Sequence, residues 1–577
     1  MKLRSFFYAL AAGASVLLLI ALGGFFGLTA QSPLNLLQEG ALKTPTAAIF
    51  VPKQTPAMVS LLVNPDRLTA FRQLLTPPAN RRRSRAELTQ LENSLFVNLG
   101  LDYRRDIQPW VGDEITLAIT SLDFDRNRQN ATQPGYLLAF TTKNAQKARE
   151  CLQLFYSRQA IAGTADLVFE KYKGVNLVYR RSFPELETSK YQPKFNQKSE
   201  SVTSAVVGDR FVLIANHPKV LRDAINNVQA HDLNLANDPE YQQMLQSLTE
   251  PRIGVSFVNL PALAAWISNQ PLPAQESFQA SQTLAIALSL DRQGLLAQTA
   301  VLGSELTEEN LAPILSKPVD ALGYIPAQSA LAIAGTDLNQ LWNRFSTAVA
   351  SDDTLESVIN RAIANWQSRW GIELPEDIFS WVQGDYALSL LPRPDQANPD
   401  LIFVAQNTDT KEPNSSIKHL DEIAEQRGLS VGKLPLGERN ITAWTKLVTS
   451  AIRLDKNDNL MNLEAKVQGL RATVGNYEIF TTSIEAMEEA LKGQQDNSLL
   501  KSEAFQHAIA PLPINNDGYL YLDWSKSKPF IERQLPIVRV FELVGKPLFD
   551  HLRSLTISSY GIDKGVQRSK LFMELVD

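Results

Sequence analysis

The chain repeats most of its recognisable segments, and this duplication constrains its fold more than any single motif does. Residues 100–113 read GLDYRRDIQPWVGD, and residues 371–385 read GIELPEDIFSWVQGD. At one spacing (381 − 110 = 271) they match Asp106 with Asp377 and Trp110 with Trp381. A period this long far exceeds the roughly 20–50 residues of solenoid repeats. We therefore expect each repeat to form a whole domain.

Further segments repeat in the same order while their spacing drifts, which indicates two homologous units with insertions in their loops. The additional matches are FVPKQTPAMV (50–59) with YIPAQSALAI (324–333), VVGDRFVLI (206–214) with TVGNYEIFT (473–481), DPEYQQML (238–245) with SEAFQHAI (502–509), and GVSFVN (254–259) with GYLYLD (518–523). The predicted organisation comprises an N-terminal segment 1–30, a linker 31–44, a first unit 45–303, a linker 304–318 and a second unit 319–577.

Each unit reads as strands joined by hairpins and interrupted by helices. Residues 114–122 alternate as a strand, and residues 204–215 predict a hairpin about Gly208, which needs a positive φ. Asn216 and Asp238 are the expected N-caps of two helices. This pattern predicts an α+β fold with mainly antiparallel sheets and packed helices in both units.

Residues 6–28 form a long apolar segment, FFYALAAGASVLLLIALGGFFGL. A membrane-spanning helix needs about 20 apolar residues, and no charge lies between Arg4 and Glu39. The basic residues that precede the segment place the N-terminus in the cytoplasm and the body on the periplasmic or lumenal side. We predict an uncleaved transmembrane anchor. A removed signal peptide is the alternative, although Leu28-Thr29-Ala30 is a poor cleavage site.

Charge and cysteine content exclude some classes of protein. The formal net charge of −5 argues against nucleic acid as a partner, and the basic run at residues 81–85 is expected to be a solvated helix entry. The single cysteine, Cys151, cannot form an internal disulfide.

Catalytic and metal-binding motifs are incomplete throughout. Ser415 and Ser498 begin Ser-x-x-Lys patterns without a following Lys-Thr-Gly, and residues 428–433 are one residue short of a phosphate-binding loop. Asp123 opens a calcium-like loop that lacks the required Gly and Glu. The five histidines show no zinc-ligand spacing. We therefore predict no catalytic residue, no cofactor and no metal site.

The repeated Trp and Asp residues are the best candidates for a binding or structural role. A large aromatic residue before a core strand usually closes the end of a core, and a ligand-stacking platform is the alternative for Trp110 and Trp381. Asp106 and Asp377 are expected to cap the turns that carry these tryptophans. An acid pair formed across the two units is the alternative for them.

The layout resembles an uncharacterised domain-of-unknown-function family found mainly in cyanobacteria. The resemblance is carried by DIQPWVGD at 106–113, by the hairpin at 205–215 and by the stretch from DPEYQQML to GVSFVN. It covers most of residues 45–577 and implies an N-terminal apolar segment followed by a long exported region. It brings no activity, cofactor or catalytic residue.

Two classes of function are consistent with these observations. One is a non-catalytic, membrane-tethered protein of the cell envelope that binds a partner protein, a lipid or the cell wall. The other is an exported hydrolase or transferase whose site is assembled from scattered residues.

Overall fold

The computed structural model describes most of the chain downstream of residue 41. The described residues are 42–64, 102–126, 132–161, 166–181, 202–268, 283–302, 314–342, 377–393, 396, 398–408, 415–455, 458–493, 497–534 and 549–576. The predicted anchor at residues 6–28, the basic run at 81–85 and most of the predicted linker 304–318 lie outside them. None of the helices in the described ranges is long and apolar enough to cross a bilayer.

The described strands form one continuous sheet of twenty strands, in which every pairing is antiparallel. The strands of the first half are β1 (Ala57–Leu61), β2 (Val111–Ser121), β3 (Gly135–Thr142), β4 (Asp166–Tyr172), β5 (Val175–Arg181), β6 (Thr203–Val207), β7 (Phe211–Ala215), β8 (Gly254–Asn259), β9 (Thr283–Asp291) and β10 (Gly294–Leu302). Those of the second half are β11 (Leu331–Thr336), β12 (Asp385–Leu391), β13 (Asp400–Gln406), β14 (Ser430–Leu436), β15 (Arg439–Asp455), β16 (Asp458–Val474), β17 (Tyr477–Thr481), β18 (Tyr519–Asp523), β19 (Leu552–Asp563) and β20 (Val566–Leu575).

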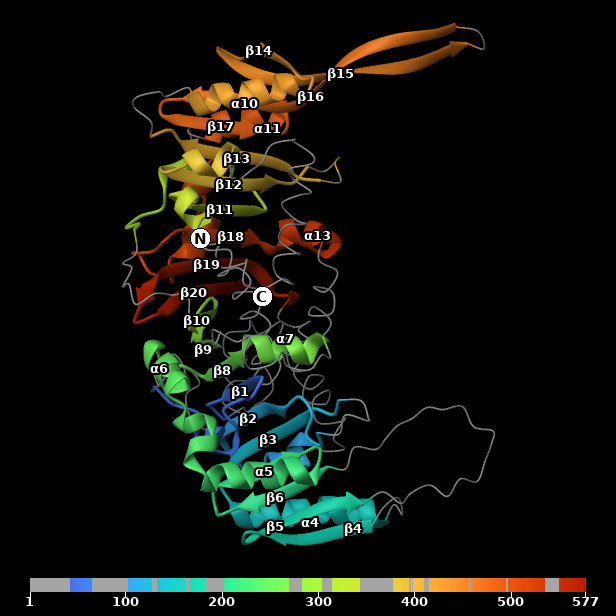
Figure 1. The fold of residues 1–577 in the computed structure, drawn as a ribbon, viewed down its shortest axis with the longest axis vertical. Helices are drawn as coiled ribbons and strands as arrows, with labels where there is room; N and C mark the ends of the chain where they lie inside the picture. Colours follow the sequence, from blue (N-terminus) through green and yellow to red (C-terminus); the bar gives the residue numbers. More distant parts are fainter. Residues whose placement is uncertain are drawn as a thin grey trace.

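The strand order is the same in both halves when each is followed from its outer edge to the centre. The first half runs β4-β5-β6-β7-β3-β2-β1-β8-β9-β10. The second runs β14-β15-β16-β17-β13-β12-β11-β18-β19-β20. The halves join at the centre, where β10 pairs with β20 from Gly294↔Glu574 to Leu302↔Val566. The strands therefore stack along the long axis of the molecule, from β14 at one end to β4 at the other (Figure 1).

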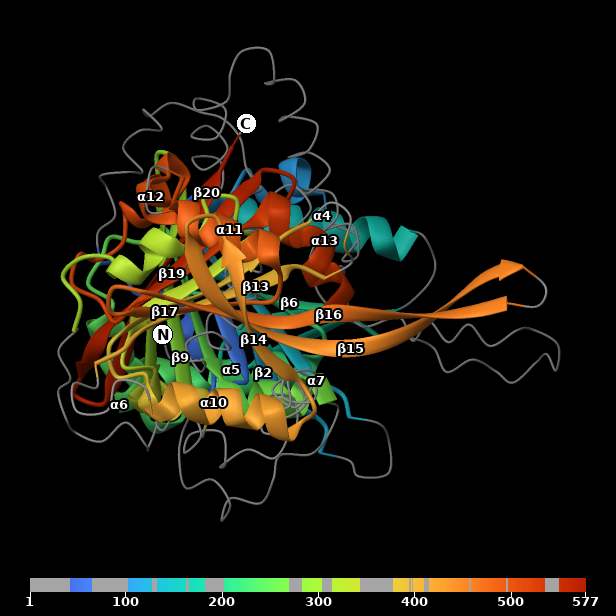
Figure 2. The same ribbon diagram turned by 90° about the horizontal axis from the view of Figure 1, so that it is seen from above.

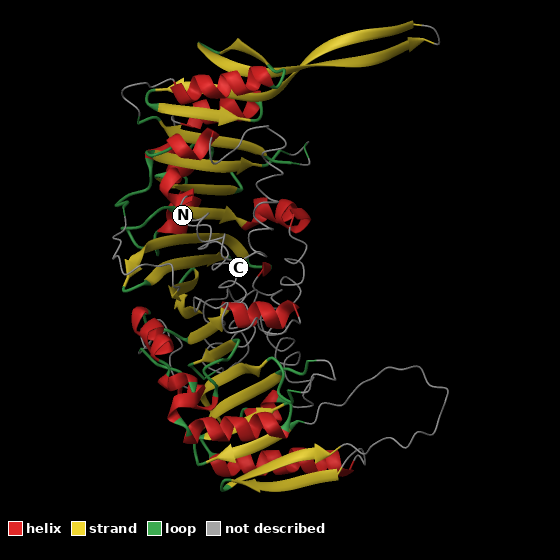
Figure 3. Ribbon diagram, in the orientation of Figure 1, coloured by secondary structure: helices red, strands yellow, loops and turns green. Residues whose placement is uncertain are grey.

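Helices cover both faces of this sheet (Figures 2 and 3). They are α4 (Ala145–Ile161), α5 (Pro218–Gln229), α6 (Pro239–Ser247), α7 (Leu260–Ser268), α10 (Ser415–Gln426), α11 (Ile484–Gly493), α12 (Glu503–Ile509) and α13 (Trp524–Gln534). Neighbouring residues of β20 show how the faces divide, because Phe572 packs in a core with α11 and α12 whereas Leu571 packs in a core with α4 and α13. Helices α5 and α6 cover the same face as α11 and α12, and α10 covers the same face as α4.

Short helical turns also occur in the described residues. They are η2 (Thr46–Phe50), η3 (Tyr103–Ile107), η4 (His231–Leu233), η5 (Leu235–Asn237), η7 (Asp320–Tyr324), η9 (Phe379–Trp381) and η10 (Leu499–Lys501). After η2, Pro52 forms a β-bridge with Asn234, and after η7, Pro326 forms a β-bridge with Ser498. Equivalent long-range contacts therefore fix the chain ahead of the first strand in each half.

The α+β class with mainly antiparallel sheet is confirmed. Gly208 and its counterpart Gly475 have the predicted positive φ, at 57° and 63°. Asp238 caps α6 as predicted, accepting a hydrogen bond from the Tyr241 amide. The predicted cap at Asn216 is wrong, because the ring of His217 accepts the capping hydrogen bond of α5 while the side chain of Asn216 bonds to the start of β3.

Candidate functional site

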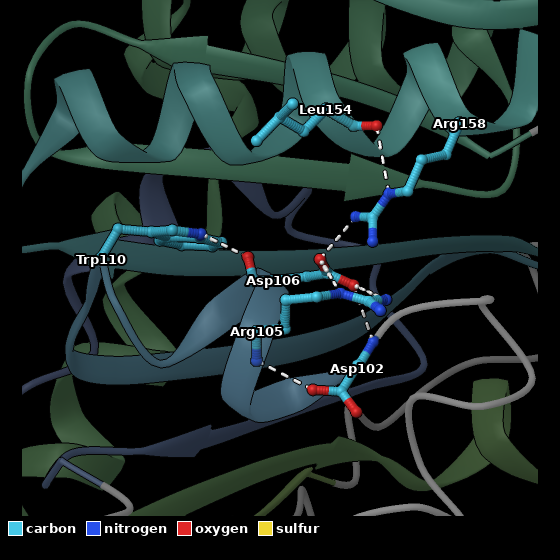
Figure 4. Close-up of polar contacts among 6 residues, drawn as sticks. All are labelled: Asp102, Arg105, Asp106, Trp110, Leu154 and Arg158. Atoms are coloured by element: carbon cyan, nitrogen blue, oxygen red, sulfur yellow. Dashed lines mark hydrogen bonds and ion pairs between the residues drawn. The ribbon is translucent and has the colours of Figure 1, made fainter.

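The Trp110 site is built on a single turn that leads into β2. Asp102 precedes the turn η3 and caps it, because its carboxylate accepts a hydrogen bond from the Arg105 amide at 2.8 Å. In return, the Asp102 amide donates to the Asp106 carboxylate at 2.9 Å. This reciprocal arrangement satisfies donors that a turn start otherwise leaves without partners. It fixes Asp106 and Trp110 on one short, rigid segment (Figure 4).

The carboxylate of Asp106 is buried and surrounded by donors. Arg105 donates to both of its oxygens, each at 3.0 Å. Arg158 reaches from α4 and donates to Oδ1 at 2.7 Å, while its Nε donates to the Leu154 carbonyl (Figure 4). Only 3% of the Asp106 side chain is exposed. The turn and the helix are thus held together by one carboxylate between two guanidinium groups.

The electrostatics of the site keep the Asp106 carboxylate charged at neutral pH. Burial acts to raise the pKa of Asp106, but hydrogen bonds from Arg105, from the Asp102 amide and from Arg158 outweigh it and lower the pKa to about 2. A carboxylate with so low a pKa is a weak base and carries no proton to donate at neutral pH. The geometry suits a structural anchor and does not suit general acid–base catalysis.

Trp110 lies inside the core. It is 1% exposed, and its ring meets Phe140 edge to face at a centroid distance of 5.4 Å. The indole N–H donates to the Asp106 carbonyl at 2.6 Å. Both faces of this ring are therefore occupied by protein, and it offers no platform for stacking a ligand.

The second half repeats part of this arrangement. The indole of Trp381 donates to the Asp377 carbonyl at 3.0 Å, as Trp110 does to Asp106. The carboxylate differs, because Oδ1 of Asp377 lies 3.6 Å from Nε2 of His419 on α10. Trp381 is half-buried and packs at the edge of its core.

The structure does not bring the two aspartates together. Eight strands lie between β2 and β12, which begin beside them, so at about 4.8 Å per strand the aspartates are some 40 Å apart. An acid pair across the two halves is excluded by this separation.

A second, partly buried cluster of charged residues lies at the outer end of the second half. Arg471 on β16 donates to Asp421 on α10 at 3.0 Å and lies 3.5 Å from Glu478 on β17. The indole of Trp444 on β15 donates to the other Asp421 oxygen at 2.8 Å. Burial raises the pKa of Glu478 despite its hydrogen bonds from Thr473 and Arg471. No sequence motif indicated this cluster, because its members come from four separate elements.

The residues of the incomplete motifs occupy ordinary structural positions. Ser415 begins α10, Ser498 precedes η10, and Gly428 adopts a φ of 75° in the turn before β14. Within the described ranges, no three His, Cys, Asp or Glu side chains are grouped as metal ligands.

Comparison with known proteins places the chain in a family. A family model described as "Protein of unknown function (DUF3352)" matches residues 10–575. The chain belongs to this family. Membership of an uncharacterised family, expected from the sequence resemblance, is thereby confirmed. No curated protein matches the chain. A solved structure, "Structure of crystal form I of TP0453", is 9% identical and aligns over 45% of this chain and 80% of the other, with a TM-score of 0.23 that does not indicate a shared fold.

Proposed function

We propose that this member of the DUF3352 family is a non-catalytic binding or scaffold protein of the cell envelope, anchored in the membrane by residues 6–28. The observation that carries the proposal is the saturation of the best candidate site. The Asp106 carboxylate is the buried charged group of the repeated motif. Its oxygens accept hydrogen bonds from three neighbours within the fold, Asp102, Arg105 and Arg158. Its role is to hold the turn, the helix α4 and the sheet in one arrangement.

The proposal includes two homologous domains, residues 45–303 and 319–577. Support comes from the matched sequence blocks, the identical strand order of the two halves and the shared indole–carbonyl hydrogen bond. An elongated sheet with two like halves presents two similar surfaces far apart, which suits simultaneous contact with a protein, a lipid or the cell wall.

Anchoring is proposed from the apolar segment and its flanking charges. The uninterrupted run of uncharged residues is long enough to span a bilayer, and the preceding Lys2 and Arg4 favour a cytoplasmic N-terminus. The resemblance noted from the sequence further suggests a cyanobacterial envelope, with the body in the periplasm or an internal lumen.

Membrane fractionation and capture of partners test the proposal together. The full-length chain should sediment with membranes, and pull-down of the detergent-solubilised protein should recover an envelope component in fixed ratio. Recovery of the chain in the soluble fraction, or a mature N-terminus near Gln31, would contradict anchoring. Covalent labelling of a serine by a fluorophosphonate probe would favour the exported hydrolase instead.

A further inference from the structure

Strand β4 forms one end of the sheet, and one of its two edges has no partner among the described strands (Figure 1). In the described part of the chain β4 pairs with β5 alone, from Asp166↔Arg181 to Tyr172↔Val175. An open strand edge presents backbone N–H and C=O groups that can pair with another chain. We call this unpaired side of the strand the β4 edge.

The turn that follows β4 determines which of its backbone groups point outward. Lys173 and Gly174 form a two-residue hairpin loop with φ of 48° and 85°, as in a type I′ turn. The flanking residues, Tyr172 and Val175, exchange hydrogen bonds with each other, and this arrangement recurs at every second residue of the strand. The backbone groups of the residues in between therefore point away from β5. These outward positions are Leu167, Phe169 and Lys171.

The side chains of β4 differ on its two faces. Phe169 is 73% exposed, although it lies on the same face as Leu167, which packs in the core with α4. On the opposite face, Arg222 of α5 donates to both oxygens of the Glu170 carboxylate, at 2.8 and 2.7 Å. The β4 edge thus combines a large exposed aromatic ring with a carboxylate whose charge is already paired.

Strand β14, at the other end of the sheet, has a blocked edge. It also pairs with a single described strand, β15, and a two-residue turn with Gly437 at a φ of 60° joins Leu436 to Arg439. By the same alternation, Pro435 occupies an outward position. Proline has no N–H to donate and commonly protects edge strands from pairing. All three outward positions of β4 keep their N–H groups, so the two ends of the sheet differ in their capacity to pair.

The β4 edge is complementary to itself in one antiparallel register. If two copies are centred on Phe169, that residue lies opposite its copy, and Leu167 lies opposite Lys171 twice by symmetry. All three outward positions then exchange hydrogen bonds with the second copy. Centring the pair one residue away, on Val168 or Glu170, uses only two outward positions of β4. Centring on Glu170 also places this carboxylate opposite its copy, which is unfavourable.

We propose that the β4 edge binds the β4 edge of a second copy of this chain through antiparallel pairing centred on Phe169. The sheet then continues across the two molecules, and their exposed Phe169 rings pack side by side. The chain uses the same mode of contact internally, since its halves join by antiparallel pairing of β10 with β20. One strand pair is small beside the roughly 1,200–2,000 Å² of stable interfaces, so we expect a weak, concentration-dependent dimer. The inference does not depend on export or anchoring.

Mixed disulfide trapping of the full-length chain tests the register. In a Cys151→Ser background, one preparation carries Leu167→Cys and a second, with a longer affinity tag, carries Lys171→Cys. Their mixture should form a cross-linked dimer under mild oxidation, because opposite residues have Cα atoms about 5.5 Å apart. Within either preparation alone, the two cysteines of a dimer lie four residues apart along the strands, at least about 13 Å, and should not cross-link.

The edge that carries Pro435 provides the matched control. Lys433 is exposed at an outward position of β14, so Lys433→Cys offers a thiol as accessible as that of Lys171→Cys. Its mixture with Leu167→Cys should give no cross-linked dimer. A cross-link between these two variants would indicate head-to-tail contact of β4 with β14 and would overturn the proposal.

Charges at position 169 provide an independent check. Phe169→Lys in both preparations, or Phe169→Glu in both, places like charges opposite each other and should reduce the cross-linked fraction severalfold. Phe169→Lys in one preparation with Phe169→Glu in the other should restore it. Equal thermal melting of all variants will show that the body is folded. A mixture that does not cross-link, equal cross-linking within a single preparation, or a yield that ignores these charges would also overturn the proposal.

Discussion

At the scale of single residues, the repeated motif joins a tryptophan to the carbonyl four residues before it. The sequence drew attention to Asp106 and Trp110 because both recur at one spacing, as Asp377 and Trp381. It did not reveal Arg158, whose contact with Asp106 spans 52 residues and depends on how α4 packs. Local patterns predict capping and turns, whereas the partners of a buried charge are set by tertiary packing.

Truncation of the Trp110 side chain is expected to destabilise the fold. Trp110→Ala removes a fully buried ring and should lower the free energy of unfolding by about 3–5 kcal/mol. Trp381→Ala should cost less, since Trp381 is only half-buried. Urea unfolding monitored by circular dichroism measures both. Equal stability of Trp110→Ala and the unaltered chain would mean that the ring does not support the core.

The Asp106 site predicts a specific pH dependence. Its folded pKa of about 2 lies below the ordinary value for aspartate, so the charged form stabilises the fold. This contribution, about 2 kcal/mol, is complete above pH about 4 and is lost as the pH falls toward 2. Asp106→Asn should lower stability at pH 6, and the difference from the unaltered chain should shrink at pH 3. A constant difference in urea unfolding across this range would contradict the assignment.

At the scale of elements, the helix caps show what a sequence pattern can resolve. Asp238 was identified correctly because Asp before Pro is a common helix start. Asparagine is a favoured cap residue, but the side-chain amide of Asn216 is hydrogen-bonded to Tyr136 and Pro134, and the adjacent His217 caps α5 instead. Long-range hydrogen bonds of the Asn216 side chain thus outweigh its local preference for capping a helix.

Strands β15 and β16, which extend past their neighbours β14 and β17, offer a test at the same scale. Gly469→Ala should displace the Trp444 ring, because the new Cβ would lie 2.8 Å from its Cε3 atom. We expect faster amide hydrogen exchange at residues 445–455 and 458–467, where β15 and β16 pair only with each other, and little change in α5, which lies toward the other end of the molecule. Unchanged exchange in these parts of β15 and β16 would show that Trp444 does not hold the extension in place.

At the scale of the whole molecule, the joining of the two halves into one sheet was not predicted. The sequence blocks indicated two units, and the shared strand order agrees with them, but no local pattern indicates that β10 pairs with β20. Such an edge-to-edge contact depends on residues 264 to 280 positions apart (566 − 302 and 574 − 294).

The pairing of β10 with β20 can be tested at Gly294. A Cβ atom there would lie too close to the Met573 carbonyl oxygen, so Gly294→Ala should disrupt one end of the β10–β20 pairing. We expect increased amide exchange in β10 and β20 and a lower melting temperature. Gly174→Ala is a control for a surface turn, since nothing lies within 4 Å of its added Cβ, although its φ of 85° carries some strain. Protection of β10 equal to that of the unaltered chain would contradict the role of Gly294.

The central position of β20 also affects the order in which the molecule is completed. A ribosome releases the chain from its N-terminus, so β10 emerges long before Val566, the first residue of its neighbour β20. During that interval β10 has one bare edge, and any chain that stops before Val566 keeps it bare along with an edge of β19. Unpaired edges promote aggregation. Nascent and truncated chains should therefore depend on chaperones until the last strand is inserted at the middle of the sheet.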